Sequence, residues 1–314
     1  MRPPPDPPNH GRRSSATTPV PSPRLFLDSI PKAGAHLAER ALEELGIRRG
    51  QGPLGSSTLF GRQQLVKSLT RRPLLTADIA LVGIEVATPV RASWLRRRLR
   101  GVEPGQYLRG HVQYSDAFAS LLSELDFRVL HVVRDPRDVA VSHAHYMMAR
   151  PRHPFHRFYR DLGDFDRRLA FSIGGGWIPG AGYLASIGER YRLMQGWARY
   201  PGALTLRFED LVGERGGGTR EAQHAALVRL SELVEVPGAD VGGIAEGIFG
   251  GSSTFRKGRI GGWRESFGER HHELFDAVLK KYNDGGFVDY AALLKDREDL
   301  DAYLADPEAY LASH

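Results

Sequence analysis

Three short segments, far apart in the sequence, carry basic residues beside a glycine or a predicted helix start, which suits phosphate binding. The first follows an apolar run and reads Pro31-Lys32-Ala33-Gly34. A helix that starts at the carboxyl end of a strand offers unpaired backbone N–H groups and a positive dipole end to an anion. Gly34 lets the backbone approach a phosphate closely, and Lys32 adds a compact charge with three donors. A surface lysine in a tight turn would explain the same four residues.

The second segment, VLHVVRDPRDVAVSHAHY, repeats the change from strand to helix. Asp135 suits the helix cap and Pro136 its first turn, while Asp138 stands three residues after the cap. Helix initiation does not require Arg134 or Ser142, and Ser142 lies four residues after Asp138 on the same helix face. An arginine and a hydroxyl at a strand end suit a terminal phosphate. The alternative is an ion pair between Arg134 and Asp138.

The third segment, TFRKGRIGGW, is too rich in glycine for a regular element. Arg256 and Lys257, followed by Gly258, predict a flexible clamp for an anion with additional backbone donors. Trp263 and Phe267 are expected to anchor this loop to the body of the protein. Such basic runs can also be merely solvated.

Short apolar runs alternate with helical segments along the chain. We expect strands at 25–30, 79–86, 107–112, 127–133 and 203–208, and helices at 34–45, 91–100, 115–125 and 219–234. This alternation predicts an α/β fold with a mostly parallel sheet flanked by helices on both faces. Ligands of such sheets bind beyond the carboxyl ends of the strands, where the first two segments lie.

A single domain is expected over residues 24–305. Residues 1–23 are rich in Pro, Ser and Arg and predict a disordered tail, and residues 306–314 form a short C-terminal tail. Residues 151–200 interrupt the alternation with a basic-aromatic stretch, a glycine run and an amphipathic helix at 183–199. This helical insertion is expected to shape a ligand pocket, or else to be a helical layer without a ligand.

Composition excludes several classes of function. The chain has no cysteine, which rules out disulfides, thiolate catalysis and Cys-ligated zinc and fits a cytoplasmic location. The net charge of +6 favours anionic partners, but no nucleic-acid-binding signature accompanies it. No apolar run approaches the length of a membrane span. The Lys32 loop is not the nucleoside-triphosphate loop, because no magnesium-binding hydroxyl follows it, and no metal site is expected.

With these three segments in order, residues 25–267 resemble the PAPS-dependent sulfotransferases, which transfer a sulfuryl group from 3′-phosphoadenosine 5′-phosphosulfate (PAPS). The resemblance implies a P-loop-like sulfotransferase architecture of bacterial type. It implies that PKxGxx cradles the 5′-phosphosulfate, that RKGxxGxW covers the 3′-phosphate and nucleotide, and that LRFEDL, like the family's YEDL, lies near adenine. The implied nucleotide-binding residues are Lys32, Ala33, Gly34, Ala35, His36, Leu37, Arg134, Ser142, Phe208, Phe255, Arg256, Lys257 and Gly258.

Four loop positions depart from the family pattern. Ala33 and Ala35 stand where the family has hydroxyls, each worth about 0.5–3 kcal/mol as a hydrogen bond, His36 replaces a second threonine, and Leu37 replaces a tryptophan. The expected function is transfer of a sulfuryl group to a hydroxyl of a small-molecule or glycan-like acceptor. The alternative is a catalytically silent nucleotide-binding relative. The sequence gives no indication of the oligomeric state.

The implied catalytic residues are His111 and Lys32. His111 follows a short strand in GHVQYS and resembles the catalytic-histidine segment of the family; a histidine suits the removal of a proton from the acceptor. Its alternative role is a strand-end histidine bonded to the backbone. Lys32 would neutralise charge on the leaving phosphate. His36, His143 and His145 lie near the nucleotide loops and are weaker candidates for the base, and His271 and His272 are expected to be solvated.

Overall fold

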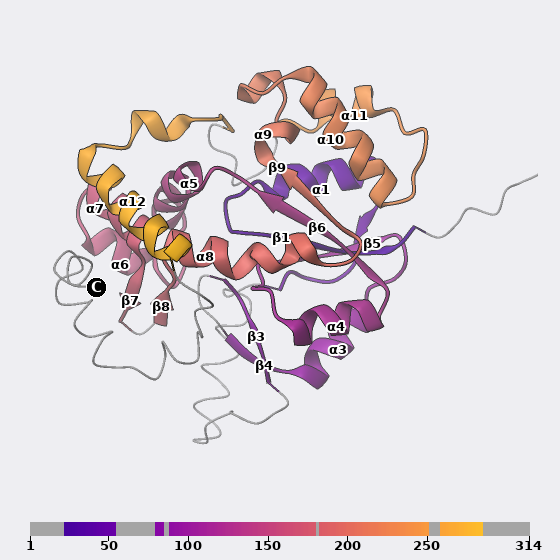
Figure 1. Ribbon diagram of the computed structural model, residues 1–314, viewed down its shortest axis with the longest axis horizontal. Coiled ribbons are helices and arrows are strands. Elements are labelled where there is room, and N and C mark those ends of the chain that lie inside the picture. The colour runs from indigo at the N-terminus through magenta and orange to yellow at the C-terminus, as the bar shows by residue number, and fades with distance from the viewer. Residues whose placement is uncertain (1–21, 55–78, 85–87, 180–181, 251–257, 285–314) are drawn as a thin grey trace, which may run out of the picture.

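The computed structural model describes residues 22–54, 79–84, 88–179, 182–250 and 258–284 (Figure 1). Both expected tails fall almost entirely outside these ranges. Three of the predicted nucleotide-binding residues, Phe255, Arg256 and Lys257, also lie outside them.

A five-stranded sheet forms the centre of the described fold, in the order β2-β5-β1-β6-β9. Every pairing between neighbouring strands in this sheet is parallel, which confirms the expected sheet type. In register, Asp28 of the central strand lies opposite Gly110 on one side and His131 on the other. The strands are β1 (Arg24–Ser29), β2 (Arg48–Arg49), β5 (Gln106–Gly110), β6 (Phe127–Val133) and β9 (Ala203–Arg207).

Helices cover both faces of the sheet because successive side chains of a strand point to opposite faces (Figure 1). Leu25 and Leu27 pack with α1 (Ala35–Glu44), α10 (Arg220–Leu233) and α11 (Val241–Gly247). Phe26 faces the other way and packs with α4 (Asp116–Glu124), α5 (Pro136–Ala149) and α8 (Ile187–Met194). The continuous apolar runs in the sequence therefore correspond to strands that are buried on both faces.

The expected strand at 79–86 is not part of the parallel sheet. β3 (Ile79–Val82) pairs in antiparallel fashion with β4 (Thr88–Arg91) in a separate two-stranded sheet. The connection between them is too short for a parallel pairing, which needs a crossover of a dozen or more residues. The predicted helix that follows is confirmed as α3 (Ala92–Arg100).

The insertion contains a β-hairpin where its last predicted helix was expected to begin. After α6 (His156–Asp161) and α7 (Phe165–Gly174), β7 (Gly176–Ile178) pairs with β8 (Gly182–Leu184). Ser186 and Glu189 then form a capping box, so α8 starts at Ile187 and ends in the 3-10 turn η1 (Gln195–Arg199). The start of the helix at 187 rather than 183 is thus set by this cap.

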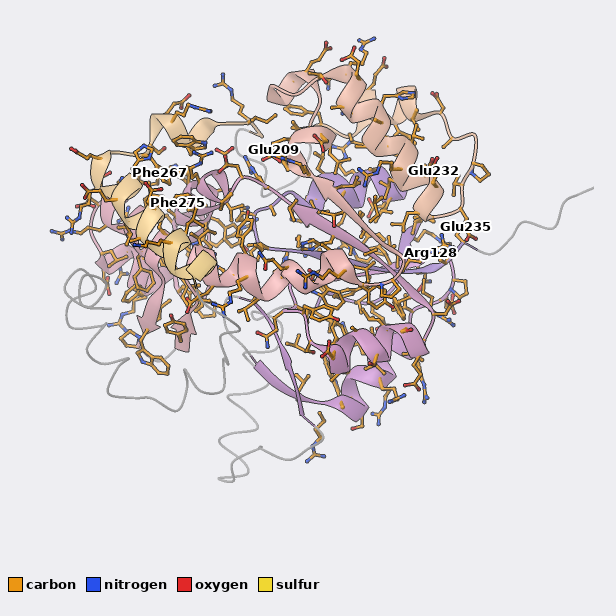
Figure 2. All side chains as sticks on the ribbon, viewed as in Figure 1. Arg128, Glu209, Glu232, Glu235, Phe267 and Phe275 are labelled. Atoms are coloured by element: carbon orange, nitrogen blue, oxygen red, sulfur yellow. The ribbon has the colours of Figure 1, made fainter. Side chains whose placement is uncertain are left out.

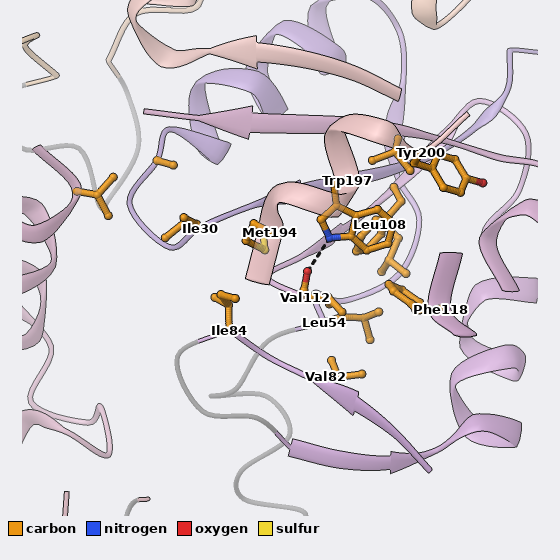
Figure 3. Packing of buried hydrophobic residues seen from close by; sticks show 14 of the residues in the cluster. Ile30, Leu54, Val82, Ile84, Leu108, Val112, Phe118, Met194, Trp197 and Tyr200 are labelled. Carbon is orange, nitrogen blue, oxygen red and sulfur yellow. Dashed lines mark hydrogen bonds between the residues drawn. The ribbon is translucent and has the colours of Figure 1, made fainter. Parts of the chain in front are cut away.

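Trp197 is the centre of an aromatic group beneath the sheet (Figure 3). Its ring lies 5.6 Å from both Phe26 and Phe118, measured between centroids. Its Nε1–H donates to the carbonyl oxygen of Val112 at 2.8 Å. Aromatic packing and a backbone hydrogen bond therefore meet at the end of β5.

The last residue of β5, Gly110, has no space for a side chain. A Cβ there would lie 2.5 Å from Cζ of Phe26. We predict that Gly110→Ala lowers the free energy of unfolding by about 1–3 kcal/mol, because it overpacks a closed core. Urea denaturation measures this, with Gly247→Ala as the control, since its nearest neighbour would be 3.8 Å away. Equal stability of the two variants would contradict the packing at Gly110.

Candidate functional site

Arg134 connects three segments that are far apart in the sequence. Its Nη1 donates to the carbonyl oxygen of Lys32 at 3.3 Å, and its Nη2 donates to that of Arg259 at 3.0 Å. Its guanidinium carbon also lies 4.1 Å from the centroid of the Phe208 ring. The first segment, the LRFEDL segment and the described part of the third segment therefore meet at the carboxyl end of β6.

Asp138 holds the third segment to the second. Its Oδ2 accepts from the backbone N–H of Gly261 at 2.8 Å, and its Oδ1 accepts from that of Trp263 at 2.9 Å. Burial raises the pKa of Asp138, and Arg134 and the two amides act against that rise. Arg134 Nη2 lies 3.8 Å from Asp138 Oδ2, so the alternative ion pair is also present. The sequence identified Asp138 by its place in the helix start and as a possible partner of Arg134, but its hydrogen bonds to the third segment were missed.

Trp263 anchors the third segment, as its position in the sequence predicted. Its ring is buried, and the guanidinium carbons of Arg137 and Arg264 lie 3.9 and 4.7 Å from the ring centroid. Phe267 meets the same ring edge-on at 5.5 Å. Figure 2 shows Phe267 close to Phe275 of α12 (Glu269–Asp284), and their ring centroids are 5.9 Å apart.

Glu209, labelled in Figure 2, fixes the start of the second segment. Its Oε1 accepts from the backbone N–H of Asp135 at 2.7 Å. The hydroxyl of Tyr191 donates to the carbonyl oxygen of Arg134 from the opposite side, and burial raises the pKa of that phenol. The single peptide between Arg134 and the cap residue is thus held by two other elements, α9 (Phe208–Leu211) and α8.

The first segment is a strained turn that leads into α1. Lys32 adopts the left-handed conformation with φ of 76°, which is uncommon for a residue with a side chain. Its Nζ lies 4.4 Å from the centroid of the Tyr146 ring on α5. Gly34 has φ of 106°, and a Cβ there would lie 2.6 Å from Cδ2 of Phe208. In this structure the glycine is therefore required by the packed Phe208 ring as well as by the turn.

Ala33, Ala35 and Leu37, the positions that depart from the family pattern with apolar side chains, differ in solvent exposure. Ala33 and Ala35 are buried, and Leu37 is half-buried against the α1 side of the core. Among the side chains of this turn, Lys32 and His36 thus carry the polar atoms. The predicted residue Ser142 is half-buried on α5, and Gly258 has φ of 57° with its carbonyl oxygen against Gly216.

His36 belongs to an ion cluster around the buried carboxylate of Glu39, which the sequence did not reveal. Its Nδ1 lies 2.8 Å from Oε2 of Glu39, which is 3% exposed. Arg109 reaches the same carboxylate at 2.8 Å and Arg49 at 2.5 Å. Burial alone raises the pKa of Glu39, but His36, Arg109 and Arg49 together outweigh it and hold this pKa at about 2. The cluster joins α1 to β5 and β2.

His111 lies directly after β5 and is bonded to the backbone of β1. Its Nδ1 is 2.6 Å from the carbonyl oxygen of Ser29, and its own backbone N–H donates to the carbonyl oxygen of Leu54 at 2.9 Å. A carbonyl oxygen can only accept, so Nδ1 carries a proton, and in the neutral ring the lone pair is therefore on Nε2. The alternative role, a histidine bonded to the backbone, is thus confirmed for Nδ1. The Nε2 of this tautomer has the lone pair that a general base requires.

His143, His145 and His271 pack against or hydrogen-bond to other parts of the fold. His143 is buried within hydrogen-bond distance of Ser172 and Tyr159, and His145 stacks on Phe165. The expectation of a solvated His271 is wrong. Its Nδ1 accepts from the backbone N–H of Gly268, its Nε2 lies 3.0 Å from the carbonyl oxygen of Asp166, and its side chain is buried.

Neither a metal-binding group nor a membrane-spanning helix is found among the described residues. They contain no group of three or more His, Asp or Glu that could hold a metal ion. None of their helices is both long enough and apolar enough to cross a membrane.

The ion cluster predicts a pH-dependent stability. A pKa lowered from 4.5 to about 2 stabilises the fold by about 3 kcal/mol above the unfolded-state pKa, and this stabilisation is lost as the pH falls through the folded-state value. Glu39→Gln imitates the protonated acid. We therefore expect wild type to exceed Glu39→Gln in unfolding free energy by a constant amount above about pH 5, and the difference to shrink toward about pH 2. A difference that does not change with pH in urea titrations would contradict the cluster.

The fold is similar to that of solved sulfotransferase structures. No family model matches the chain, and no curated protein matches it. Among solved structures, mouse sulfotransferase SULT7A1 complexed with PAP is similar over 87% of this chain and 88% of that chain, with 16% identity and a TM-score of 0.53. Retinol dehydratase in complex with androsterone and PAP matches over 85% and 82%, with 16% identity and a TM-score of 0.41. The five parallel strands, the helices on both faces and the likeness to SULT7A1 show that this chain has the α/β fold of a sulfotransferase.

Proposed function

We propose that this protein is a PAPS-dependent sulfotransferase that transfers a sulfuryl group to an acceptor hydroxyl. The observation that carries the proposal is the meeting of separate anion-binding segments at Arg134, which contacts Lys32, Arg259 and Phe208. PAPS has anionic groups at two ends, and such a ligand needs cations and backbone donors from more than one loop. SULT7A1, which has the same fold, was crystallised with PAP.

The proposal assigns the two ends of the donor to different segments. The N-terminus of α1 and the ammonium of Lys32 would bind the 5′-phosphosulfate. Arg134 and Ser142 would bind the 3′-phosphate, with Gly258 and the cations that precede it in the third segment closing over it. Phe208, packed between Gly34 and Arg134, would lie near the adenine. His36 and Leu37 would contact the nucleotide from the first turn of α1.

The chemistry is an in-line displacement at sulfur. The acceptor oxygen forms a bond to sulfur while the bond between sulfur and the 5′-phosphate oxygen breaks. The proton of the acceptor hydroxyl passes to Nε2 of His111, whose Nδ1–H is held by the Ser29 carbonyl. Adenosine 3′,5′-bisphosphate (PAP) leaves, and Lys32 stabilises the charge that develops on its 5′-phosphate.

The proposed function also includes a binding pocket for the acceptor. Its pocket would be formed by the stretch before His111 and by the insertion at 151–200, and the acceptor would be a small molecule or a glycan-like molecule with a hydroxyl. Arg157 and Arg160 of the insertion are largely exposed and pair with Asp161, which favours a solvated basic face over a direct acceptor contact. A cytoplasmic location remains part of the proposal.

Two buried alanines in the first segment favour an alternative function, nucleotide binding without sulfuryl transfer. Ala33 and Ala35 supply no hydroxyl to a phosphate, so a relative that binds the nucleotide without transferring sulfate is the second candidate. The two candidates differ in one observable. An active enzyme releases PAP from PAPS in the presence of a phenol or alcohol, whereas a silent relative binds PAP and releases none.

Removal of the base separates chemistry from binding. We expect His111→Ala to lower the rate of PAP release by about 10²–10⁴-fold while the dissociation constant for PAP stays within about threefold of wild type. His224→Ala, on the exposed side of α10, is the matched control and should keep the wild-type rate. Unchanged turnover in His111→Ala would remove this histidine from the mechanism.

Recognition of the 3′-phosphate is tested by comparing two nucleotides. Arg134→Ala should weaken PAP binding by about 10–100-fold, the value of one or two hydrogen bonds to a charged group. Adenosine 5′-monophosphate binding should weaken by a smaller factor, because that ligand loses only the support that Arg134 gives to the Lys32 turn. Isothermal titration with both ligands measures this, and Arg220→Ala, which is largely exposed on α10, is the control. Equal losses for the two nucleotides would place the 3′-phosphate contact elsewhere.

A further inference from the structure

Asp28 is a fully buried carboxylic acid that the proposed mechanism does not use. It lies near the end of the central strand β1, and its side chain is 0% exposed. Its Oδ1 accepts from the backbone N–H of Val112 at 3.0 Å. Val112 is the residue that follows His111, so a buried side chain of β1 holds the peptide that carries the proposed base.

Two further contacts hold the imidazole ring of His111 and the next peptide, between Val112 and Gln113. The carbonyl oxygen of Ser29, the neighbour of Asp28, is 2.6 Å from Nδ1 of His111. Nε1 of Trp197 donates to the carbonyl oxygen of Val112 at 2.8 Å (Figure 3). With these bonds in place, the backbone after β5 and the imidazole ring have one arrangement relative to β1.

His131 lies beside the second oxygen of Asp28, although neither that oxygen nor the Nδ1 of His131 has a hydrogen-bond partner among the described residues. The two residues lie opposite each other in the register of β1 and β6, and Oδ2 of Asp28 is 3.4 Å from Nδ1 of His131. Burial raises the pKa of Asp28, and His131 and the Val112 amide act against that rise. A raised pKa is what a carboxyl group away from water is expected to show.

We propose that Asp28 is a positioning residue for His111, acting through its hydrogen bond to the Val112 backbone. The inference rests on the proposed function, because His111 is the base only if the protein transfers sulfuryl groups. Without the carboxylate oxygen, the buried N–H of Val112 has lost its acceptor and the peptide must shift to find another. A shift of that kind moves the imidazole away from the acceptor oxygen while the nucleotide loops stay in place.

Two substitutions separate the hydrogen bond from the charge. Asp28→Asn keeps an oxygen that can accept from Val112, and Asp28→Ala removes it. We expect Asp28→Ala to lower kcat by about 10²-fold, the cost of a displacement of about 1 Å at a reacting group, and Asp28→Asn to stay within about threefold of wild type. The assay is PAP release from PAPS with 4-nitrophenol, expressed per PAP-binding site counted by calorimetric titration. The dissociation constant for PAP should change by less than about threefold in both variants.

A spectroscopic readout does not depend on turnover. Long-range ¹H–¹⁵N correlation spectra report which ring nitrogen of a histidine carries the proton, and His111→Asn assigns the resonance. Wild type and Asp28→Asn should show His111 protonated at Nδ1, and Asp28→Ala should show altered ring shifts or a mixture of tautomers. This readout stays informative if the wild-type protein releases no PAP, an outcome that would refute the proposed function rather than the positioning by Asp28.

Val129→Ala controls for a general loss of packing. Val129 is buried on the same face of the sheet, on the neighbouring strand β6, and does not bond to the His111–Val112 peptide. It should lower the melting temperature and leave both kcat per binding site and the His111 ring shifts unchanged. If Asp28→Ala does not fold, Trp197→Phe is the second variant. It removes the hydrogen bond from Trp197 to the carbonyl oxygen of Val112, and it should lower kcat while the affinity for PAP is retained. Wild-type kcat and ring shifts in Asp28→Ala, or equal losses in Asp28→Ala and Asp28→Asn, would overturn the inference.

Discussion

The hydrogen bonds of the Arg134 guanidinium to two distant carbonyl groups are the interaction on which the candidate site depends. The side chain is 11% exposed, and it reaches the turn before α1, the third segment and the Phe208 ring at once. A planar guanidinium can do this because its donors point in fixed directions, which an ammonium cannot reproduce. The three loops are therefore assembled around one cation, which is also the group proposed to meet the 3′-phosphate.

Buried carboxylates position most of the remaining parts of the site. Asp138 holds the backbone of the third segment, Glu39 holds His36 and Arg109 between α1 and β5, and Asp28 holds the peptide after His111. Each of them accepts from donors on another element. Buried carboxylates are costly unless they are bonded in this way, so each fixes the relative position of two elements. Asp28 thus holds the backbone beside the proposed base, and Glu39 and Asp138 hold segments proposed to bind the nucleotide.

The sequence predicted those features that local patterns determine. The apolar runs gave the parallel strands, and the rule that strand ends meet at one edge brought Lys32, Arg134 and His111 to the same side of the sheet. The hydrophobic pattern could not distinguish β3 of the antiparallel hairpin from a strand of the central parallel sheet, because short strands of both kinds have the same apolar run. The bonds of Asp28 to Val112, of Glu39 to Arg109 and of Asp138 to Gly261 and Trp263 join residues 70 to 125 positions apart, and no local spacing encodes such contacts. His271 was misjudged for the same reason, because its burial comes from α7.

The central claim is that one nucleotide is bound at both of its ends by loops that Arg134 brings together. A crystal structure with adenosine 3′,5′-bisphosphate tests it most directly. We expect the 5′-phosphate against the N-terminus of α1 beside Lys32 and the 3′-phosphate against Arg134 and Ser142. A nucleotide bound away from these residues, or one with only a single phosphate in contact with them, would contradict the account.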